Sequence, residues 1–128
     1  MDKSVLDASA LLALLHREPG YDVVLRYLPG ALMSAVNLAE VLTKLEDEGM
    51  PTQEALAACN MLPITVCAFG QAEATGTAAL RHETRRAGLS LGDRACLQLA
   101  RSEHAQAITA DRSWSNLDLD IDVVVVRP

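Results

Sequence analysis

The sequence predicts one α/β domain, with a mostly parallel sheet covered by helices on both faces. Three observations support this. Strand-like runs alternate with helix-like segments along all 128 residues. Few two-residue hairpin signals separate those runs, and most of the runs are apolar, as strands of a covered parallel sheet are. A hydrophobic fraction of 50% is enough for one packed core, and a chain of this length usually forms one domain. We therefore treat residues 1–128 as a single domain.

The first half of the chain predicts two strands and four helices. Pro-Gly pairs and Gly49 end three of the helices, and Pro51 stands where a further helix opens. One helix carries leucine and valine at i, i+3, i+4 and i+7, the spacing of a buried stripe. The predicted elements are a strand at 4–7, helices at 8–17 and 21–28, a strand at 31–34, and helices at 35–49 and 51–61.

The second half repeats the alternation. Residues 63–69 form a β-branched run typical of a central strand, and the last run is apolar enough to be buried on both faces. Between them we expect two helices, another strand and a short turn or helix. These elements are a strand at 63–69, helices at 71–87 and 90–104, a strand at 105–110, the turn at 111–117 and a strand at 121–126.

Composition excludes several classes of protein. No stretch approaches the roughly 20 apolar residues of a membrane span, and the charged start of the chain is unlike a signal peptide, so we expect a cytoplasmic protein. The net charge of −6 argues against a general polyanion binder. It suits a basic partner, or a site where metal ions supply the positive charge.

Neither the cysteines nor the histidines predict a metal site. No cysteine pair has CxxC spacing and no histidine pair has HxxxH spacing. We expect buried thiols and solvent-facing imidazoles. The residues concerned are Cys59, Cys67, Cys96, His16, His82 and His104.

Four acidic residues fall where parallel strands end or helices begin. Asp7 ends the first strand, Asp111 follows the strand at 105–110, and Asp93 and Glu40 lie early in helices. Ligands of open parallel sheets bind at this edge. Each aspartate also has a simpler explanation, because aspartate often caps a helix or complements its dipole. For Glu40, a helical wheel places the side chain about 150° from the apolar stripe, which predicts a solvated surface acid.

Taken together, the four acids favour a different interpretation. With no lysine nearby, carboxylates at one sheet edge repel one another unless cations lie between them. Oxygen-only ligands suit Mg²⁺ or Mn²⁺. One or two such ions, about 3.5–4 Å apart when paired, can support phosphodiester hydrolysis without a Ser/His/Asp triad.

Five polar residues near these acids are candidate helpers. Ser9 and Thr109 can orient a carboxylate, and Asn37 can hydrogen-bond Glu40 or a phosphate. Ser9 can equally cap a helix, and Thr109 can be an ordinary strand residue. Arg94 and Arg112 each follow an acid, which is compatible with RNA phosphate contacts or with surface ion pairs.

Four segments, in order and spacing, resemble a known family: "VLDASALLALL", "SAVNLAEV", "GLSLGDRACLQLA" and "ITADRSW". They resemble PIN domains of the VapC toxin type, over essentially the whole chain. The resemblance implies a three-layer α/β/α sandwich of about five strands and an Mg²⁺- or Mn²⁺-dependent endoribonuclease. It also implies a homodimer inhibited by a VapB-type antitoxin. The implied acidic ligands are Asp7, Glu40, Asp93 and Asp111, supported by Ser9 and Thr109.

Other classes of protein fit the sequence less well. A receiver-like signalling domain needs adjacent acids after its first strand, an acceptor aspartate after its third and a late lysine. Here Asp7 stands alone, the third strand runs into Phe69 and Gly70, and the lysines are Lys3 and Lys44. A Rossmann nucleotide binder lacks its GxGxxG motif. A non-catalytic PIN-like binding module remains as an alternative to the nuclease.

Overall fold

The computed structural model describes residues 3–128, in which five strands form one all-parallel sheet of order β3-β2-β1-β4-β5. The expected α/β class and parallel sheet are confirmed. The strands are β1 (Ser4–Leu6), β2 (Ala31–Ser34), β3 (Ile64–Cys67), β4 (Gln106–Thr109) and β5 (Val123–Val125). The helices are α1 (Ala8–Leu15), α2 (Tyr21–Tyr27), α3 (Ala35–Asp47), α4 (Thr52–Asn60), α5 (Gln71–Thr84) and α6 (Leu91–Ser102).

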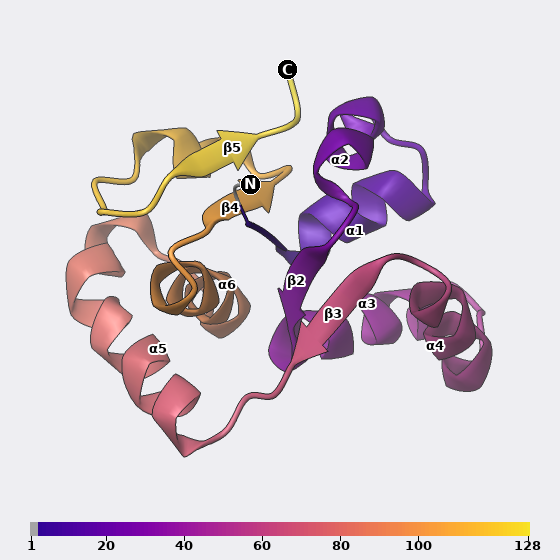
Figure 1. Ribbon diagram of the computed structural model, residues 1–128, viewed down its shortest axis with the longest axis horizontal. Helices are drawn as coiled ribbons and strands as arrows, with labels where there is room; N and C mark the ends of the chain where they lie inside the picture. The colour runs from indigo at the N-terminus through magenta and orange to yellow at the C-terminus, as the bar shows by residue number, and fades with distance from the viewer. Residues whose placement is uncertain (1–2) are drawn as a thin grey trace.

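Helices cover both faces of the sheet, which gives three layers (Figure 1). Side chains alternate along each strand, so neighbouring residues enter different cores. Leu6 and Ile108 are fully buried in the core beneath α1, α2, α3 and α4. Val5 and Ala107 are fully buried in the second core, beneath α5 and α6. The apolar runs of the sequence therefore build a sheet with two buried faces.

Two predictions about the strands are wrong. The run at 63–69 is an edge strand rather than a central one, and Thr65 and Val66 within it are exposed. The run at 121–126 is the other edge, where Val123–Val125 are only half-buried. β-Branched residues suit any pleated, partly covered surface, so composition alone does not separate an edge strand from a central one.

Smaller differences concern helix ends and one thiol. The helix expected at 71–87 ends as α5 at Thr84 and continues as a 3₁₀ turn, Arg85–Ala87. Cys59 and Cys96 are buried as expected, but Cys67 is only half-buried because it lies on the edge strand. No helix in the described part of the chain is both long and apolar enough to cross a membrane.

The strand order places a crevice between β1 and β4. The chain winds outward from β1 through β2 to β3, and then returns to add β4 and β5 on the opposite side. Open parallel sheets bind ligands at such a switch point, outside the carboxyl ends of the strands. Asp7 follows β1 and Asp111 lies just beyond β4, so both acids lie at this point. The observed order also differs from the 2-1-3-4-5 order of receiver-like domains.

Candidate functional site

A pocket of about 270 Å³ at the carboxyl edge of the sheet is lined by all four candidate acids. Asp7 comes from the end of β1, Glu40 from α3, Asp93 from the first turn of α6, and Asp111 from the turn after β4. Asn37 and Ser9 line the same pocket. The structure therefore brings together residues that are up to about a hundred positions apart in the sequence.

Asp7 is the most deeply buried of the four acids, with 4% of its surface exposed. It caps α1, and its Oδ1 accepts a hydrogen bond of 2.8 Å from the backbone N–H of Ala10. Ser9 Oγ donates to the same oxygen at 2.8 Å, and Thr109 Oγ1 donates to Oδ2 at 2.6 Å. Both carboxylate oxygens are thus held in place by donors from α1 and β4.

The hydroxyls of Ser9 and Thr109 also join the start of α1 to the end of β4. Ser9 Oγ accepts a hydrogen bond of 2.9 Å from the N–H of Ala110. Thr109 Oγ1 accepts one of 3.0 Å from the N–H of Asp111. Each hydroxyl thus links the Asp7 carboxylate to the backbone that carries Asp111. Thr109 is fully buried, so this link is shielded from water.

Asp93 and Asp111 begin helical turns as well as lining the pocket. Asp93 Oδ2 accepts from the N–H of Ser90 at 3.0 Å, and Ser90 Oγ accepts from the N–H of Asp93 at 3.2 Å, forming a capping box. Asp111 Oδ1 accepts from both the N–H and the hydroxyl of Ser113. The simpler explanations are therefore correct, since Asp7 and Asp111 are helix caps and Asp93 is a first-turn acid, and they do not exclude a place in the pocket.

Glu40 is exposed, as the helical wheel predicts, yet its carboxylate is turned toward α6. Asn37 Nδ2 donates to Glu40 Oε1 at 2.8 Å and to the carbonyl oxygen of Gly92 at 3.0 Å. Asn37 itself is only 1% exposed. The Glu40 carboxylate occupies the space that a β-carbon on residue 92 would need. The absence of a side chain at Gly92 therefore allows Glu40 to lie against the start of α6.

Burial and neighbouring charge raise two pKa values around the pocket. The pKa of the Asp7 carboxyl is raised from 3.8 to about 6, mainly by burial and to a smaller extent by the charge of Asp93, against the lowering effect of the hydrogen bonds from Thr109, Ala10 and Ser9. Burial also raises the pKa of the Cys96 thiol well above its usual range. The charges of Asp7, Asp93 and Glu40 add to that shift. Cys96 is therefore a neutral thiol beneath the acids.

The basic residue that lines the pocket is a lysine, and neither of the candidate arginines lines it. Arg94 and Arg112 do not line it, and Arg94 Nη1 instead donates to the carbonyl oxygen of Thr77 on α5. The expectation of no lysine nearby is wrong, because Lys44 lines the pocket one helical turn after Glu40. The i, i+4 spacing from Glu40 is the sequence signal that could have identified it. Gly92, directly before Asp93, was likewise missed.

The oxygen atoms in the pocket suit a divalent cation as ligands, although the side chains that carry them do not form a compact cluster. Within residues 3–128, no three His, Cys, Asp or Glu side chains are close enough to hold a metal ion. Each carboxylate is instead drawn to its own hydrogen-bond donor, as repulsion between like charges favours. Several oxygens nevertheless accept no hydrogen bond from any described residue. These oxygens are Glu40 Oε2, Asp93 Oδ1, Asp111 Oδ2 and the buried Asn37 Oδ1.

These potential metal ligands are all oxygen atoms, which Mg²⁺ and Mn²⁺ prefer. The buried Asn37 Oδ1 is the clearest sign of an unmet partner, because buried polar atoms are usually satisfied. The residues therefore fit a hard divalent ion chemically.

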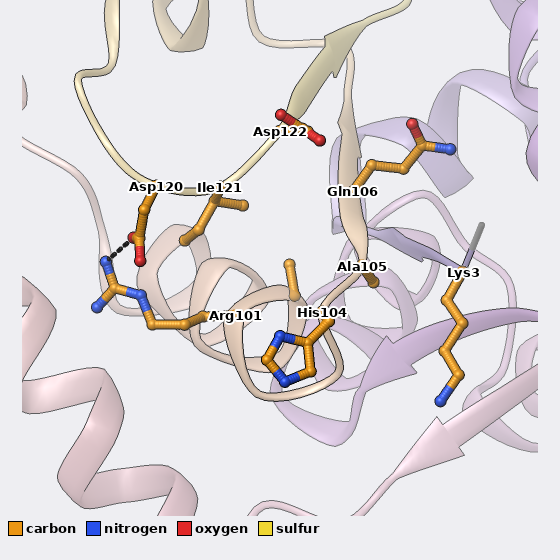
Figure 2. Close-up of a pocket in the computed structure, with 9 residues that line it drawn as sticks. Lys3, Arg101, His104, Ala105, Gln106, Asp120, Ile121 and Asp122 are labelled. Atoms are coloured by element: carbon orange, nitrogen blue, oxygen red, sulfur yellow. Dashed lines mark hydrogen bonds and ion pairs between the residues drawn. The ribbon is translucent and has the colours of Figure 1, made fainter.

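A second pocket, of about 360 Å³, lies at the opposite end of the sheet, next to the amino ends of β1 and β4 (Figure 2). Its arginine and its lysine already have partners. Arg101 pairs with Asp120 at 2.6 Å and with Glu83 at 3.0 Å, and Lys3 pairs with Glu103 at 3.2 Å. These ion pairs join α6 to α5, to the segment before β5 and to the start of the chain. The charged side chains of this pocket therefore have a structural role, because they connect neighbouring segments of the fold.

Comparison with known proteins identifies a family for the chain. The PIN domain family matches residues 4–119. No curated protein matches by sequence. Among solved structures, Mycobacterium tuberculosis VapC20, described as a sarcin-ricin loop cleaving toxin, aligns with a TM-score of 0.77 and 19% identity, over 98% of this chain and 99% of its own.

Two further structures are complexes. A toxin–antitoxin complex from Klebsiella pneumoniae aligns with a TM-score of 0.73 and 20% identity, over 94% of this chain and 95% of the other. DNA-bound VapBC from Salmonella typhimurium aligns with a TM-score of 0.71 and 18% identity, over 97% and 98%. At these identities the similarity shows a shared fold.

Proposed function

The chain belongs to the PIN domain family, and on that premise we propose that it is a metal-dependent endoribonuclease that acts as the toxin of a VapBC-type toxin–antitoxin pair. One observation carries the proposal: four acids from four separate segments line a single pocket at the switch point of a parallel sheet. A binding module without catalysis would not require four mutually repelling carboxylates in one pocket.

In this proposal Asp7, Glu40, Asp93 and Asp111 hold one or two Mg²⁺ or Mn²⁺ ions. When bound, such an ion polarises the phosphoryl group, favours ionisation of a water molecule and stabilises the leaving oxygen. The protein orients the carboxylates. Thr109 and Ser9 fix both oxygens of Asp7, which limits the rotation of that carboxylate.

The remaining acids are oriented by residues close to them in the fold. Asn37 holds Glu40 against Gly92, and Ser90 holds Asp93 through its capping box. Each of these acids keeps one oxygen that accepts no hydrogen bond from residues 3–128 and is available to a cation. Catalysis by prearranged charge depends on this kind of fixed geometry.

We also propose the partners of the toxin. A VapB-type antitoxin with a basic segment would complement the net charge of −6 and the acidic pocket. The similar structures are a toxin–antitoxin complex from K. pneumoniae and DNA-bound VapBC from S. typhimurium, which supports an antitoxin as the partner. We propose in addition a cytoplasmic homodimer. A neighbouring reading frame that encodes a small protein with a basic tail would support the pairing.

Cleavage of single-stranded RNA by the purified chain tests the activity. We expect cleavage with Mg²⁺ or Mn²⁺, none with EDTA, and a loss of at least about 100-fold in Asp111→Asn. Asp122→Asn is the matched control, because Asp122 is exposed and lines the pocket at the opposite end of the sheet. RNA left intact with either metal, or equal cleavage by Asp111→Asn and the control, would contradict the proposal.

A further inference from the structure

We propose that Lys44 binds a phosphate of the RNA substrate beside the acidic pocket, so that the RNA chain leaves the pocket across α3. This inference rests on the proposed ribonuclease function and names a substrate contact for it. Lys44 lies on α3 and lines the pocket together with the four acids. Its side chain is exposed and free to reach a ligand.

Lys44 has no carboxylate partner within the described range. Ion pairs within 4.0 Å involve other basic residues, and none of them includes Lys44. On an ordinary helix the acid four residues earlier would pair with this lysine. Here Asn37 draws Glu40 away toward Gly92. The ammonium group of Lys44 is thereby left free at the rim of the pocket.

The balance of charge in the pocket explains why the substrate would need this group. Four carboxylates and one ammonium line the pocket, a formal charge of about −3, and one divalent cation reduces it to about −1. A phosphodiester is itself negative, so it approaches an unfavourable field unless cationic groups lie beside it. The arginines do not line the pocket, and Lys44 is the one protein cation that the described residues place there.

A neighbouring hollow on α3 indicates the direction in which the RNA would leave the acidic pocket. It has a volume of about 440 Å³, and Glu40 and Lys44 line both it and the acidic pocket. Its other lining residues are Val36, Ala39, Thr43 and Asp47. The apolar side chains of Val36 and Ala39 offer a surface for the face of a base, and Asp47 leaves Lys44 as the cation that a phosphate would contact there. Lys44 lies at the boundary of the two hollows. A phosphate on Lys44 would therefore place the flanking nucleotide over this part of α3.

Binding of labelled single-stranded RNA of random sequence tests the inference, with Ca²⁺ replacing Mg²⁺ to prevent turnover. We expect Lys44→Gln to weaken binding about tenfold, and to lower the slope of log Kd against log salt by about 0.7. Lys44→Arg should restore most of the affinity. Lys3→Gln is the matched control, because it makes the same change in charge at the opposite end of β1 and should bind like the wild type.

Cleavage kinetics separate substrate binding from an effect on the acids. A substrate contact predicts a KM about tenfold higher for Lys44→Gln with kcat little changed. A loss confined to kcat, an effect on Mg²⁺ affinity alone, or equal weakening by Lys3→Gln would overturn the inference. If the wild type cleaves RNA but Lys44→Gln binds and cleaves like it, only this inference fails. If the wild type neither binds nor cleaves RNA, the proposed function itself fails.

Discussion

Asp7→Asn should remove activity and yet make the metal-free protein more stable at neutral and alkaline pH. Asp7 is 4% exposed, and burial raises its pKa from 3.8 to about 6. The folded state therefore binds this proton more tightly than the unfolded state does. Asparagine keeps an oxygen that can accept from Ala10 and Ser9 but carries no charge to bury.

The sign and size of the effect follow from the two pKa values. Between pH 3.8 and about pH 6 the unfolded chain loses the Asp7 proton while the folded chain retains it, so stability falls as pH rises through this window. A shift of about two pH units corresponds to about 3 kcal/mol. The stability advantage of Asp7→Asn should therefore grow by about 2–3 kcal/mol from about pH 4 to about pH 8.

Urea unfolding of the wild type and Asp7→Asn in EDTA, at several pH values, measures this difference directly. Mg²⁺ should then stabilise the wild type at pH 8 and have little effect on the variant, because binding to the folded state adds stability. A stability difference that does not change with pH would refute the reasoning, as would one in which the wild type gains on the variant as pH rises.

Three further substitutions test the surroundings of the pocket. Gly92→Ala should leave thermal stability nearly unchanged but lower cleavage about 100-fold, because the new methyl group displaces Glu40; cleavage within threefold of wild type would show that Glu40 needs no such space. Thr109→Val should cost about 1–2 kcal/mol in urea unfolding at pH 8 by removing the 2.6 Å hydrogen bond to Asp7. Thr109→Ser should restore it, and an equal loss in both variants would point to packing instead. Leu97→Ala should cost about 2–5 kcal/mol in unfolding while Mg²⁺ affinity is retained, since Leu97 is fully buried in the second core; a parallel loss of Mg²⁺ affinity would contradict the independence of core and pocket.

The sequence predicted the order of elements and the sheet edge that carries the acids, because both depend on local patterns. Strand–helix alternation implies parallel strands, and the carboxyl ends of parallel strands share one edge. The position of each strand across the sheet depends on contacts between distant segments. The β-branched run at 63–69 therefore suggested a central strand, whereas the fold places it at the edge.

In the pocket, one residue can both cap a helical turn and line the acidic site, so the two interpretations of each aspartate are compatible. Asp7 and Asp111 cap helical turns and also line the pocket, because the helices that follow these strands begin at that edge. Capping was therefore correct but incomplete as an explanation. The i, i+4 spacing places Lys44 near Glu40 on one helix face, but it does not show which way the two side chains turn, and no spacing identifies Gly92. Their roles depend on the direction in which Asn37 turns the Glu40 side chain, and that is a tertiary contact.

Binding of Mn²⁺ to the RNA-free protein, measured by calorimetry, tests the central claim most directly. The wild type and the control Asp122→Asn should show the same saturable binding, and Asp111→Asn should lose most of it. Asp111 lines the acidic pocket, whereas Asp122 lies at the opposite end of the sheet. Equal binding by all three proteins, or no binding by a wild type that still cleaves RNA in EDTA, would contradict a metal-dependent site at these acids.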